Sequence, residues 1–266
     1  MELQIFQVDA FAEKPFEGNP AAVVPLEAWL PDETLRAIAA ENNLAETAYF
    51  VPEGAGYRLR WFTPTVEVKL CGHATLASAH VIFTRLRPEL EKVSFETLSG
   101  GLTVTRGADG LLAMDFPARA MKPSIAPDGL EQALGARPMS VLKGVNLMAV
   151  FDKAEDVAAL RPDILGLTRV TGPLDAGLIA TAPGPEGSGI DFVSRFFAPA
   201  HGVNEDPVTG SAHCDTAPYW AKRLGRDALV ARQISKRGGT VLCEVKGERV
   251  ELRGKCADYL EGVIRV

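Results

Sequence analysis

Hydrophobic and polar positions alternate along several short stretches of the first half of the chain. A period of two is typical of strands with one buried face. The first half is therefore predicted to be strand-rich, with strands, several of them alternating, at Leu3–Ala10, Ala21–Val24, Thr47–Val51, Tyr57–Phe62, Leu102–Thr105 and Leu111–Phe116.

One early stretch follows the helical period instead. Between Pro31 and Glu41, Leu35, Ile38 and Ala39 form a narrow apolar stripe. This spacing predicts a surface helix, with Asp32 as its N-cap.

The chain also contains an internal repeat. A shared pattern of arginine, aromatic residue, phenylalanine and proline is followed by further matches in the same order. The two copies begin at Arg60 and Arg195, a separation far too long for the repeats of a solenoid. The repeat therefore predicts two similar lobes. Arg60-Trp61-Phe62-Thr63-Pro64 returns as Arg195-Phe196-Phe197-Ala198-Pro199; after a three-residue insertion, Gly72 pairs with Gly210, Arg85-Leu86 with Arg223-Leu224 and Gly100-Gly101 with Gly238-Gly239.

The boundary between the lobes is predicted near residue 119, where Pro117, Pro123 and Pro127 cluster. The predicted domains are an N-terminal lobe at 1–119 and a C-terminal lobe at 120–266. A cleft between two such lobes is a favoured place for a small-molecule site.

Each predicted lobe contains one buried helix. Ala74–Leu86 has no wide polar face, which is typical of a helix buried all round. Its counterpart, Ala212–Leu224, contains Pro218, which removes the hydrogen bond to the carbonyl of residue 214 and is expected to kink or shorten the helix. Both helices begin at a glycine-containing turn, Cys71-Gly72-His73 or Thr209-Gly210-Ser211.

Composition and charge exclude several classes of protein. Hydrophobic residues make up 47% of the 266 residues and charged residues 23%, which is typical of a folded globular chain. The net charge of −6 and the absence of long Lys/Arg clusters argue against a nucleic-acid partner. The longest uncharged stretch, Leu70–Thr84, is shorter than the about 20 apolar residues of a membrane span, so no membrane association is expected. No secretory signal is visible at the start of the sequence, so a cytoplasmic location is expected.

The cysteines and histidines give no sign of a bound cofactor. Cys71, Cys214, Cys243 and Cys256 lack a C-x-x-C spacing and are interpreted as reduced thiols. No glycine-rich phosphate loop follows a strand, and the histidines lack ligand spacing with carboxylates or cysteines. The sequence therefore predicts no metal, nucleotide or flavin.

The starts of the two buried helices are candidate anion sites, because unpaired N–H groups and the helix dipole favour negative charge there. Facing starts could hold a substrate carboxylate. His73 aligns with Ser211, which suggests that the two starts have different catalytic roles. The residues taken singly also have plainer interpretations: a hydrogen-bonded helix-start residue for His73 and for His213, a turn or capping residue for Asp206, and a solvated side chain for Glu46.

Five motifs in register resemble the phenazine-biosynthesis PhzF-like family, and the resemblance covers nearly the whole chain. It implies the diaminopimelate-epimerase-like fold, an α+β fold of two pseudo-symmetric lobes, each a curved, mostly antiparallel sheet wrapped around a central helix. It also implies a homodimer, and a last strand that can pair with the first lobe. The motifs are Phe6-Gln7-Val8-Asp9-Ala10-Phe11, Gly18-Asn19-Pro20-Ala21-Ala22-Val23-Val24, Asn43-Leu44-Ala45-Glu46-Thr47, Cys71-Gly72-His73-Ala74-Thr75 and Glu205-Asp206-Pro207-Val208-Thr209-Gly210-Ser211-Ala212-His213.

The resemblance also implies a site and a reaction. Glu46 is the implied acid/base carboxylate of a cofactor-independent isomerase that moves a proton on a small carboxylate or amino-acid-like substrate. Burial in a water-free cleft is expected to raise the pKa of Glu46. Lys69 departs from the acidic residue frequent in the family. The implied supporting residues are His73, Asp206 and Ser211, and the implied substrate-binding positions at the helix starts are Gly72, Ala74, Gly210 and Ala212.

Two alternatives remain open. The same fold resembles amino-acid epimerases that use a pair of thiols at the two helix starts, and Cys71 supplies one thiol here. The aligned position holds Thr209, whose hydroxyl cannot form an easy thiolate-like base. The second alternative is a catalytically idle protein that binds a small carboxylate.

Overall fold

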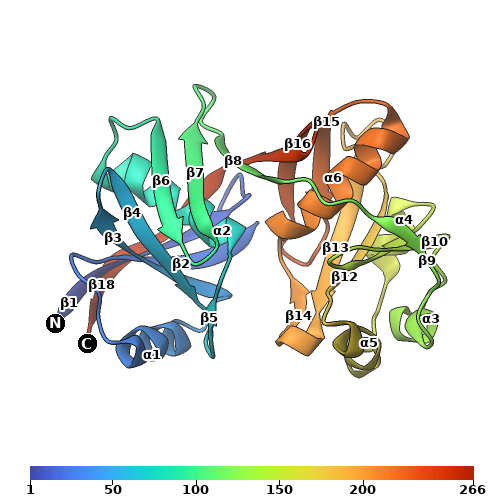
Figure 1. Cartoon of the computed structure of the whole chain (residues 1–266), viewed down its shortest axis with the longest axis horizontal. Helices are drawn as coiled ribbons and strands as arrows, with labels where there is room; N and C mark the ends of the chain where they lie inside the picture. Colours follow the sequence, from blue (N-terminus) through green and yellow to red (C-terminus); the bar gives the residue numbers. More distant parts are fainter. The chain divides into compact units, whose positions relative to one another are not determined.

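The computed structural model describes residues 1–266, which form two units (Figure 1). Unit 1 comprises Met1–Asp115 together with Arg253–Val266, and unit 2 comprises Phe116–Leu252. The chain therefore leaves unit 1, completes unit 2, and returns to unit 1 for its last strand.

Unit 1 is a mostly antiparallel sheet around one central helix. Strand pairing runs β18, β1, β2, β3, β4, β6, β7 and β8, and only the pairs β2–β3 and β4–β6 are parallel. Helix α2 packs against β1, β2, β3, β7 and β18. The elements are β1 (Glu2–Ala10), β2 (Asn19–Pro25), α1 (Asp32–Asn42), β3 (Glu46–Glu53), β4 (Gly56–Phe62), β5 (Glu67–Val68), α2 (Gly72–Val81), η1 (Ile82–Leu86), β6 (Lys92–Thr97), β7 (Gly100–Arg106), β8 (Leu112–Pro117) and β18 (Cys256–Arg265).

Unit 2 repeats this plan. Its pairing runs β9, β10, β11, β12, β13, β15 and β16, with β11–β12 and β13–β15 as the parallel pairs. Helix α6 packs against β15 and β16. The elements are β9 (Lys122–Ser124), α3 (Leu130–Leu134), β10 (Ser140–Lys143), β11 (Leu147–Val150), α4 (Ala154–Ala159), α5 (Ile164–Thr171), η2 (Gly172–Leu174), β12 (Leu178–Pro183), β13 (Phe192–Ala198), η3 (Pro199–His201), β14 (Val203–Asp206), α6 (Gly210–Leu224), β15 (Ala228–Gln233), β16 (Gly239–Lys246) and β17 (Arg249–Gly254).

The repeat in the sequence is a repeat in topology, with α2 and α6 in equivalent places. In each unit a short strand (β5 or β14) pairs with the strand before it and leads to the central helix. Arg60 clamps the first of these hairpins by two hydrogen bonds to Glu67, of 2.7 and 2.8 Å, and Arg195 clamps the second by two to Glu205, of 2.7 and 2.9 Å. The predicted fold of two similar lobes is confirmed.

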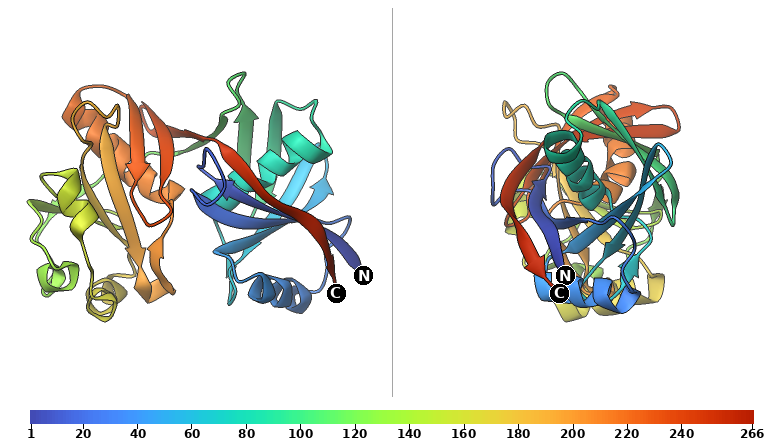
Figure 2. Two further views of the ribbon diagram at one scale, coloured as in Figure 1. Left: turned by 180° about the vertical axis from the view of Figure 1, so that it is seen from behind. Right: turned by 90° about the vertical axis from the view of Figure 1, so that its left-hand side faces the viewer.

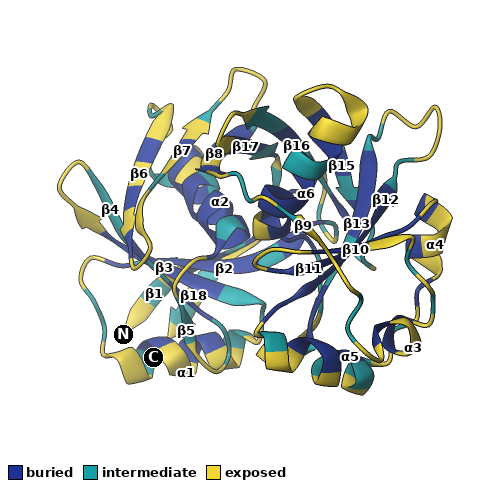
Figure 3. Cartoon of the chain, turned by 45° about the vertical axis from the view of Figure 1, so that its right-hand side comes forward, coloured by how far each residue is buried: buried dark blue, intermediate teal, exposed yellow.

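Helix α2 is buried, as its composition predicts, and Figure 3 shows it as a largely buried element. His80 alone among its residues after Gly72 escapes full burial, and its ring lies 2.9 Å from the carboxylate of Asp258. The predicted helix does not stay α-helical to Leu86. It continues from Ile82 as a π-helical turn, in which the N–H of Arg87 bonds to the carbonyl of Ile82 at 2.7 Å.

Asp32 does not cap α1, so that prediction was wrong. Pro31 occupies the N-cap position, and Asp32 is the first helical residue without a side-chain capping bond. Its carboxylate accepts a hydrogen bond of 2.9 Å from Arg60 instead. The Asp32 carboxylate therefore bonds to the guanidinium of Arg60 and not to the first N–H groups of the helix.

Pro218 does not shorten α6, which runs for 15 residues through it. The proline lacks the N–H that would bond to the carbonyl of Cys214. That carbonyl accepts a hydrogen bond of 2.9 Å from the backbone N–H of Arg119 instead. The expectation of a shortened helix was therefore wrong, because a distant segment of unit 2 replaces the missing donor.

The two chain ends lie side by side in unit 1 (Figure 2). Strand β18 pairs antiparallel with β1 from Glu2–Arg265 to Ala10–Cys256, with one irregularity after Gln7. None of the helices has the length and apolar character needed to cross a membrane.

Candidate active site

Glu46 is placed by the turn that ends α1. Asn43 adopts the left-handed conformation that terminates many helices, and its N–H bonds to Ala39. The chain then enters β3, whose first residue is Glu46, opposite Ala21 on the parallel strand β2. Asn42 donates a hydrogen bond of 3.0 Å to the hydroxyl of Thr47, which fixes this strand start.

Cys71 and His73 are placed by the start of α2. Cys71 is the N-cap in extended conformation, Gly72 is the first helical residue and His73 the second. The carbonyl of Cys71 accepts bonds from both the N–H and the hydroxyl of Thr75. These bonds hold the first turn and with it the two side chains.

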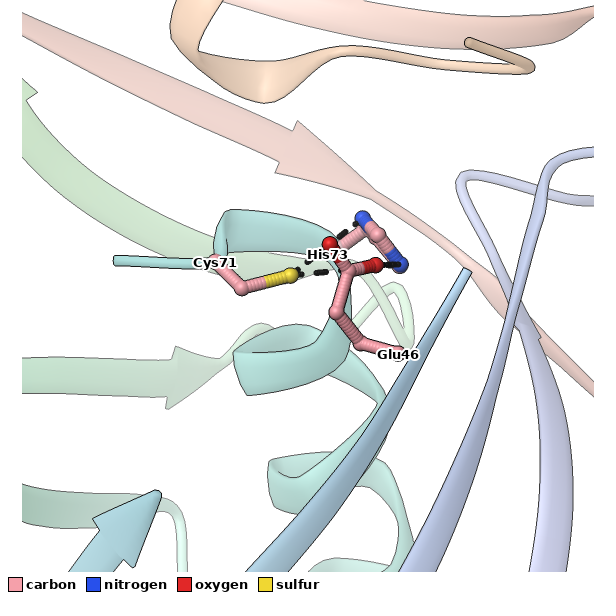
Figure 4. Close-up of side chains that lie close together, drawn as sticks. All are labelled: Glu46, Cys71 and His73. Carbon is pink, nitrogen blue, oxygen red and sulfur yellow. Dashed lines mark hydrogen bonds and ion pairs between the residues drawn. The ribbon is translucent and has the colours of Figure 1, made fainter. Parts of the chain in front are cut away.

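Glu46, Cys71 and His73 meet at this helix start (Figure 4). His73 Nε2 lies 3.0 Å from Glu46 Oε2, and Cys71 Sγ lies 3.5 Å from His73 Nδ1. Cys71 and His73 are buried, and Glu46 is half-buried. The structure therefore brings together two predicted residues, Glu46 and His73, and the thiol of the alternative hypothesis.

Glu46 and His73 form a charged pair. Burial raises the pKa of Glu46, but the charge of His73 and close polar contacts with His73 and Cys71 outweigh it, so the net pKa lies below its ordinary value. Burial alone would lower the pKa of His73, yet the acidic groups of Cys71 and Glu46 hold it well above its ordinary value. The expectation of a raised pKa for Glu46 was wrong, because it left His73 out as a partner.

Cys71 stays a thiol in this environment. Burial and the nearby carboxylate of Glu46 raise its pKa to about 11, against the opposing effect of His73. A thiol of this acidity is protonated at neutral pH and is a poor nucleophile or base.

The start of α6 in unit 2 carries a hydrogen-bonded network instead. Thr209 is the N-cap, and its hydroxyl donates a hydrogen bond to the carboxylate of Asp206. The buried amide of Gln233 accepts from the N–H of Thr209 at 2.9 Å and donates to the carbonyl of Asp206 at 2.7 Å. Asp206 is thereby fixed beside the first turn of α6.

The remaining predicted positions lie at the same two helix starts. Ala74 is buried in α2, and Gly210 and Ala212 are buried in α6. Ser211 is exposed at the second position of α6. In unit 1 the structure thus groups Glu46 and His73 with Gly72 and Ala74, and in unit 2 it groups Asp206 and Ser211 with Gly210 and Ala212.

Gln233 is the site residue that the sequence analysis missed. Its strand alternates exposed and buried positions, so Gln233 falls on the inward face with Leu229 and Ala231. A polar residue at an inward position requires buried hydrogen-bond partners. The alternation along residues 228–233 is the signal in the sequence that indicates this residue.

His213 lies one turn into α6 and is fully buried. Its Nδ1 lies 2.8 Å from the carbonyl of Thr209, and Nε2 has no hydrogen-bond partner. Burial lowers the pKa of His213 to about 4, against a small opposing effect of the Thr209 carbonyl. His213 is therefore neutral at pH 7.

Comparisons with known proteins point to one family. The family model of phenazine biosynthesis-like proteins matches residues 8–262. An uncharacterized isomerase of Pseudomonas aeruginosa is 53% identical over the full length of both chains. A crystal structure of a PhzF-family phenazine biosynthesis protein from Enterococcus faecalis superposes with a TM-score of 0.94 at 44% identity, covering 100% of each chain.

A more distant structure shares the fold alone. A hydroxyproline epimerase from Agrobacterium vitis superposes with a TM-score of 0.62 at 12% identity, covering 99% of this chain and 91% of the epimerase. The predicted epimerase-like fold class is therefore confirmed.

Proposed function

Because the chain belongs to the phenazine biosynthesis-like family, we propose that it is an isomerase that moves a proton on a small carboxylate or amino-acid-like substrate, with Glu46 as its acid/base group. Three of its curated relatives are named as isomerases. The observation that carries the finer proposal is the pair of Glu46 and His73, 3.0 Å apart at the start of α2.

The charged pair suits a proton carrier. With its pKa lowered, Glu46 is a carboxylate at neutral pH and can accept a proton from carbon. Once protonated, it is a carboxylic acid beside an imidazolium, and it returns the proton readily to another carbon. Both steps use groups of this chain, and the proposal needs no metal or organic cofactor.

Because the Glu46 carboxylate is a weak base, proton removal requires groups that stabilise the negative charge formed on the substrate. The first-turn N–H groups of α2, from Gly72 to Ala74, have no partner within the helix. We propose that they bind the substrate carboxylate and stabilise the negative charge that spreads into it as the neighbouring C–H bond breaks. Asp206, Ser211, Gly210 and Ala212 at the start of α6 remain predicted substrate-orienting and substrate-binding residues.

The thiol-based epimerase is the weaker alternative. Its first step requires a Cys71 thiolate, and the pKa of Cys71 is raised to about 11. The equivalent position in α6 is Thr209, whose hydroxyl already donates to Asp206. Neither helix start thus offers a ready sulfur or oxygen base of that kind.

The test is the uptake of solvent deuterium by a panel of small cyclic amino and hydroxy acids in deuterated water, followed by mass spectrometry. Glu46→Gln keeps the shape of the side chain and removes its ionisable oxygen, so we expect exchange to fall by about 10²–10⁴-fold. Binding of benzoate, a plain carboxylate probe, should survive. The matched control is Glu53→Gln at the exposed end of the same strand.

Cys71→Ala separates the alternatives. Under the proposal it keeps most of the exchange, because the thiol carries no proton in the reaction. If Cys71→Ala abolishes exchange and Glu46→Gln leaves it intact, the thiol-based epimerase replaces the proposal. If benzoate binds and no member of the panel exchanges with the wild-type chain, the idle binding protein is favoured.

A further inference from the structure

We propose that Glu46, Cys71 and His73 form a binding site for a zinc ion, and that zinc inhibits the chain by taking the electron pairs that accept the proton. The metal site follows from the donor atoms alone, whereas the inhibition rests on the proposed function. The spacing of the histidines in the sequence gave no sign of this group, because Glu46 comes from a different element than Cys71 and His73.

The donor set matches what zinc prefers. A thiolate, an imidazole and a carboxylate are all common zinc ligands, and three protein ligands leave a fourth position open for water or an inhibitor. The three side chains each offer one donor atom, and these atoms lie within 4.8 Å of one another.

The two distances from His73 Nε2 to the other donors fit a tetrahedral site after small rotations. Zinc bonds of about 2.0–2.3 Å place neighbouring donors about 3.3–3.6 Å apart. His73 Nε2 lies 3.0 Å from Glu46 Oε2 and 3.9 Å from Cys71 Sγ. A change of a few tenths of an ångström in each distance, which side-chain rotation supplies, brings both into the range.

One donor atom of the group lacks a hydrogen bond. Glu46 Oε2 is a buried oxygen without a hydrogen bond of good geometry, although His73 lies close to it. The Glu46 side chain is 17% exposed, which gives an ion a route to the group. Cys71 and His73 are anchored at the first turn of α2, so little conformational freedom is lost on binding.

Binding is a ligand exchange without electron transfer. Zinc replaces the thiol proton of Cys71 and the imidazolium proton of His73, and both protons pass to the buffer. The occupied Glu46 and His73 can then no longer accept and return a substrate proton. At the start of α6 the corresponding positions hold Thr209 and Ser211, which supply no thiolate or imidazole.

Cobalt(II) is the spectroscopic probe for this site. We expect the purified full-length chain to bind Co²⁺ with a thiolate-to-cobalt charge-transfer absorption and tetrahedral d–d bands, and added Zn²⁺ to abolish both. Cys71→Ser should lose the charge-transfer absorption and weaken zinc binding by more than about 100-fold, since even groups outside the ligand shell change affinity by about 10–100-fold. The control is Cys256→Ser, which removes a thiol outside the group.

Glu46→Gln provides a second variant, for use if Cys71→Ser does not fold by circular dichroism. It should keep the thiolate absorption and bind Zn²⁺ at least about tenfold more weakly in calorimetry. A wild-type chain without the thiolate band, or a band that Cys256→Ser removes, overturns the metal site. Deuterium exchange measured in a chelator is independent of this result, so the two proposals can fail separately.

Discussion

The starts of α2 and α6 are equivalent in the repeat and differ in chemistry. Both follow a hairpin clamped by an arginine–glutamate pair, and both have an extended N-cap and a glycine as the first helical residue. The start of α2 carries an ion pair between Glu46 and His73, whose facing atoms lie 3.0 Å apart. The start of α6 carries a neutral amide, Gln233, that fixes Asp206.

The difference shows which parts of a duplicated fold are free to diverge. The arginine clamps hold the hairpin that leads to the helix and are present in both units. Side chains that project from the first turn contribute little to that framework. One copy can therefore acquire a proton carrier while the other keeps a rigid hydrogen-bonded network.

Among the variants that test this comparison, the largest expected effect comes from removing the partner of Glu46. In His73→Asn, burial of Glu46 is no longer opposed by a cation, so its pKa rises above the wild-type value. We expect deuterium exchange to fall by about 10²-fold or more, and the acid limb of its pH profile to move to higher pH. His80→Asn, on the same helix, is the control. An unchanged pH profile would show that the pair does not set the titration of Glu46.

The network at α6 is tested by stability. Gln233→Leu leaves the N–H of Thr209 and the carbonyl of Asp206 without their partner in a buried place. Each unsatisfied group costs about 1–3 kcal/mol, so we expect the free energy of unfolding in urea to fall by about 2–4 kcal/mol. Gln132→Leu, at an exposed position of α3, should change it by less than about 0.5 kcal/mol. Equal effects of the two substitutions would contradict a structural role for Gln233.

The pKa values of the two buried histidines, His73 and His213, are shifted in opposite directions. The raised pKa of His73 gives stability that is complete below 6.5 and is lost as the pH rises through its folded-state pKa. The lowered pKa of Glu46 gives stability that is present above 4.5 and is lost as the pH falls. The pair thus contributes fully between pH 4.5 and 6.5.

His213 contributes differently. Its pKa of about 4 gives stability that is complete above 6.5 and is lost as the pH falls toward 4. Nuclear magnetic resonance of ring protons should show His73 still protonated at pH 7 and His213 neutral down to about pH 4. Parallel titration of both rings near pH 6.5 would remove the contrast between the helix starts.

The smallest expected effect concerns Pro218. An interior proline ordinarily costs a helix about 3 kcal/mol, so Pro218→Ala would be expected to stabilise α6 strongly. The carbonyl that the proline leaves free already accepts from Arg119, so we expect a change in unfolding free energy within about 1 kcal/mol. Thermal unfolding by calorimetry measures it. A gain near 3 kcal/mol would mean that the Arg119 bond contributes nothing.

Much of the fold could be predicted from local patterns. The pattern of hydrophobic residues, alternating in several segments, located six strands of unit 1, and the burial of α2 followed from a stretch with no wide polar face. The internal repeat predicted the second unit, because motifs that match in the same order imply matched structure. The local sequence pattern is sufficient where residues adjacent in the sequence determine the conformation.

The errors arose where distant residues intervene. Asp32 was expected to cap a helix, but Arg60 binds its carboxylate. Pro218 was expected to shorten a helix, but Arg119 replaces the lost donor. The pKa of Glu46 was expected to rise, but His73 reverses the effect of burial. The resemblance indicated the residues of the site, whereas their charge states depend on distances that no sequence pattern contains.

The pairing of β1 with β18 sets an order of assembly. The residues of unit 2 form one continuous stretch, whereas unit 1 needs the last strand to complete its sheet. During synthesis, unit 2 has all its residues before unit 1 has, so the sheet that carries Glu46 is completed only after β18 leaves the ribosome. The adjacent ends, joined by hydrogen bonds between Met1 and Val266, also make the chain a natural candidate for circular permutation.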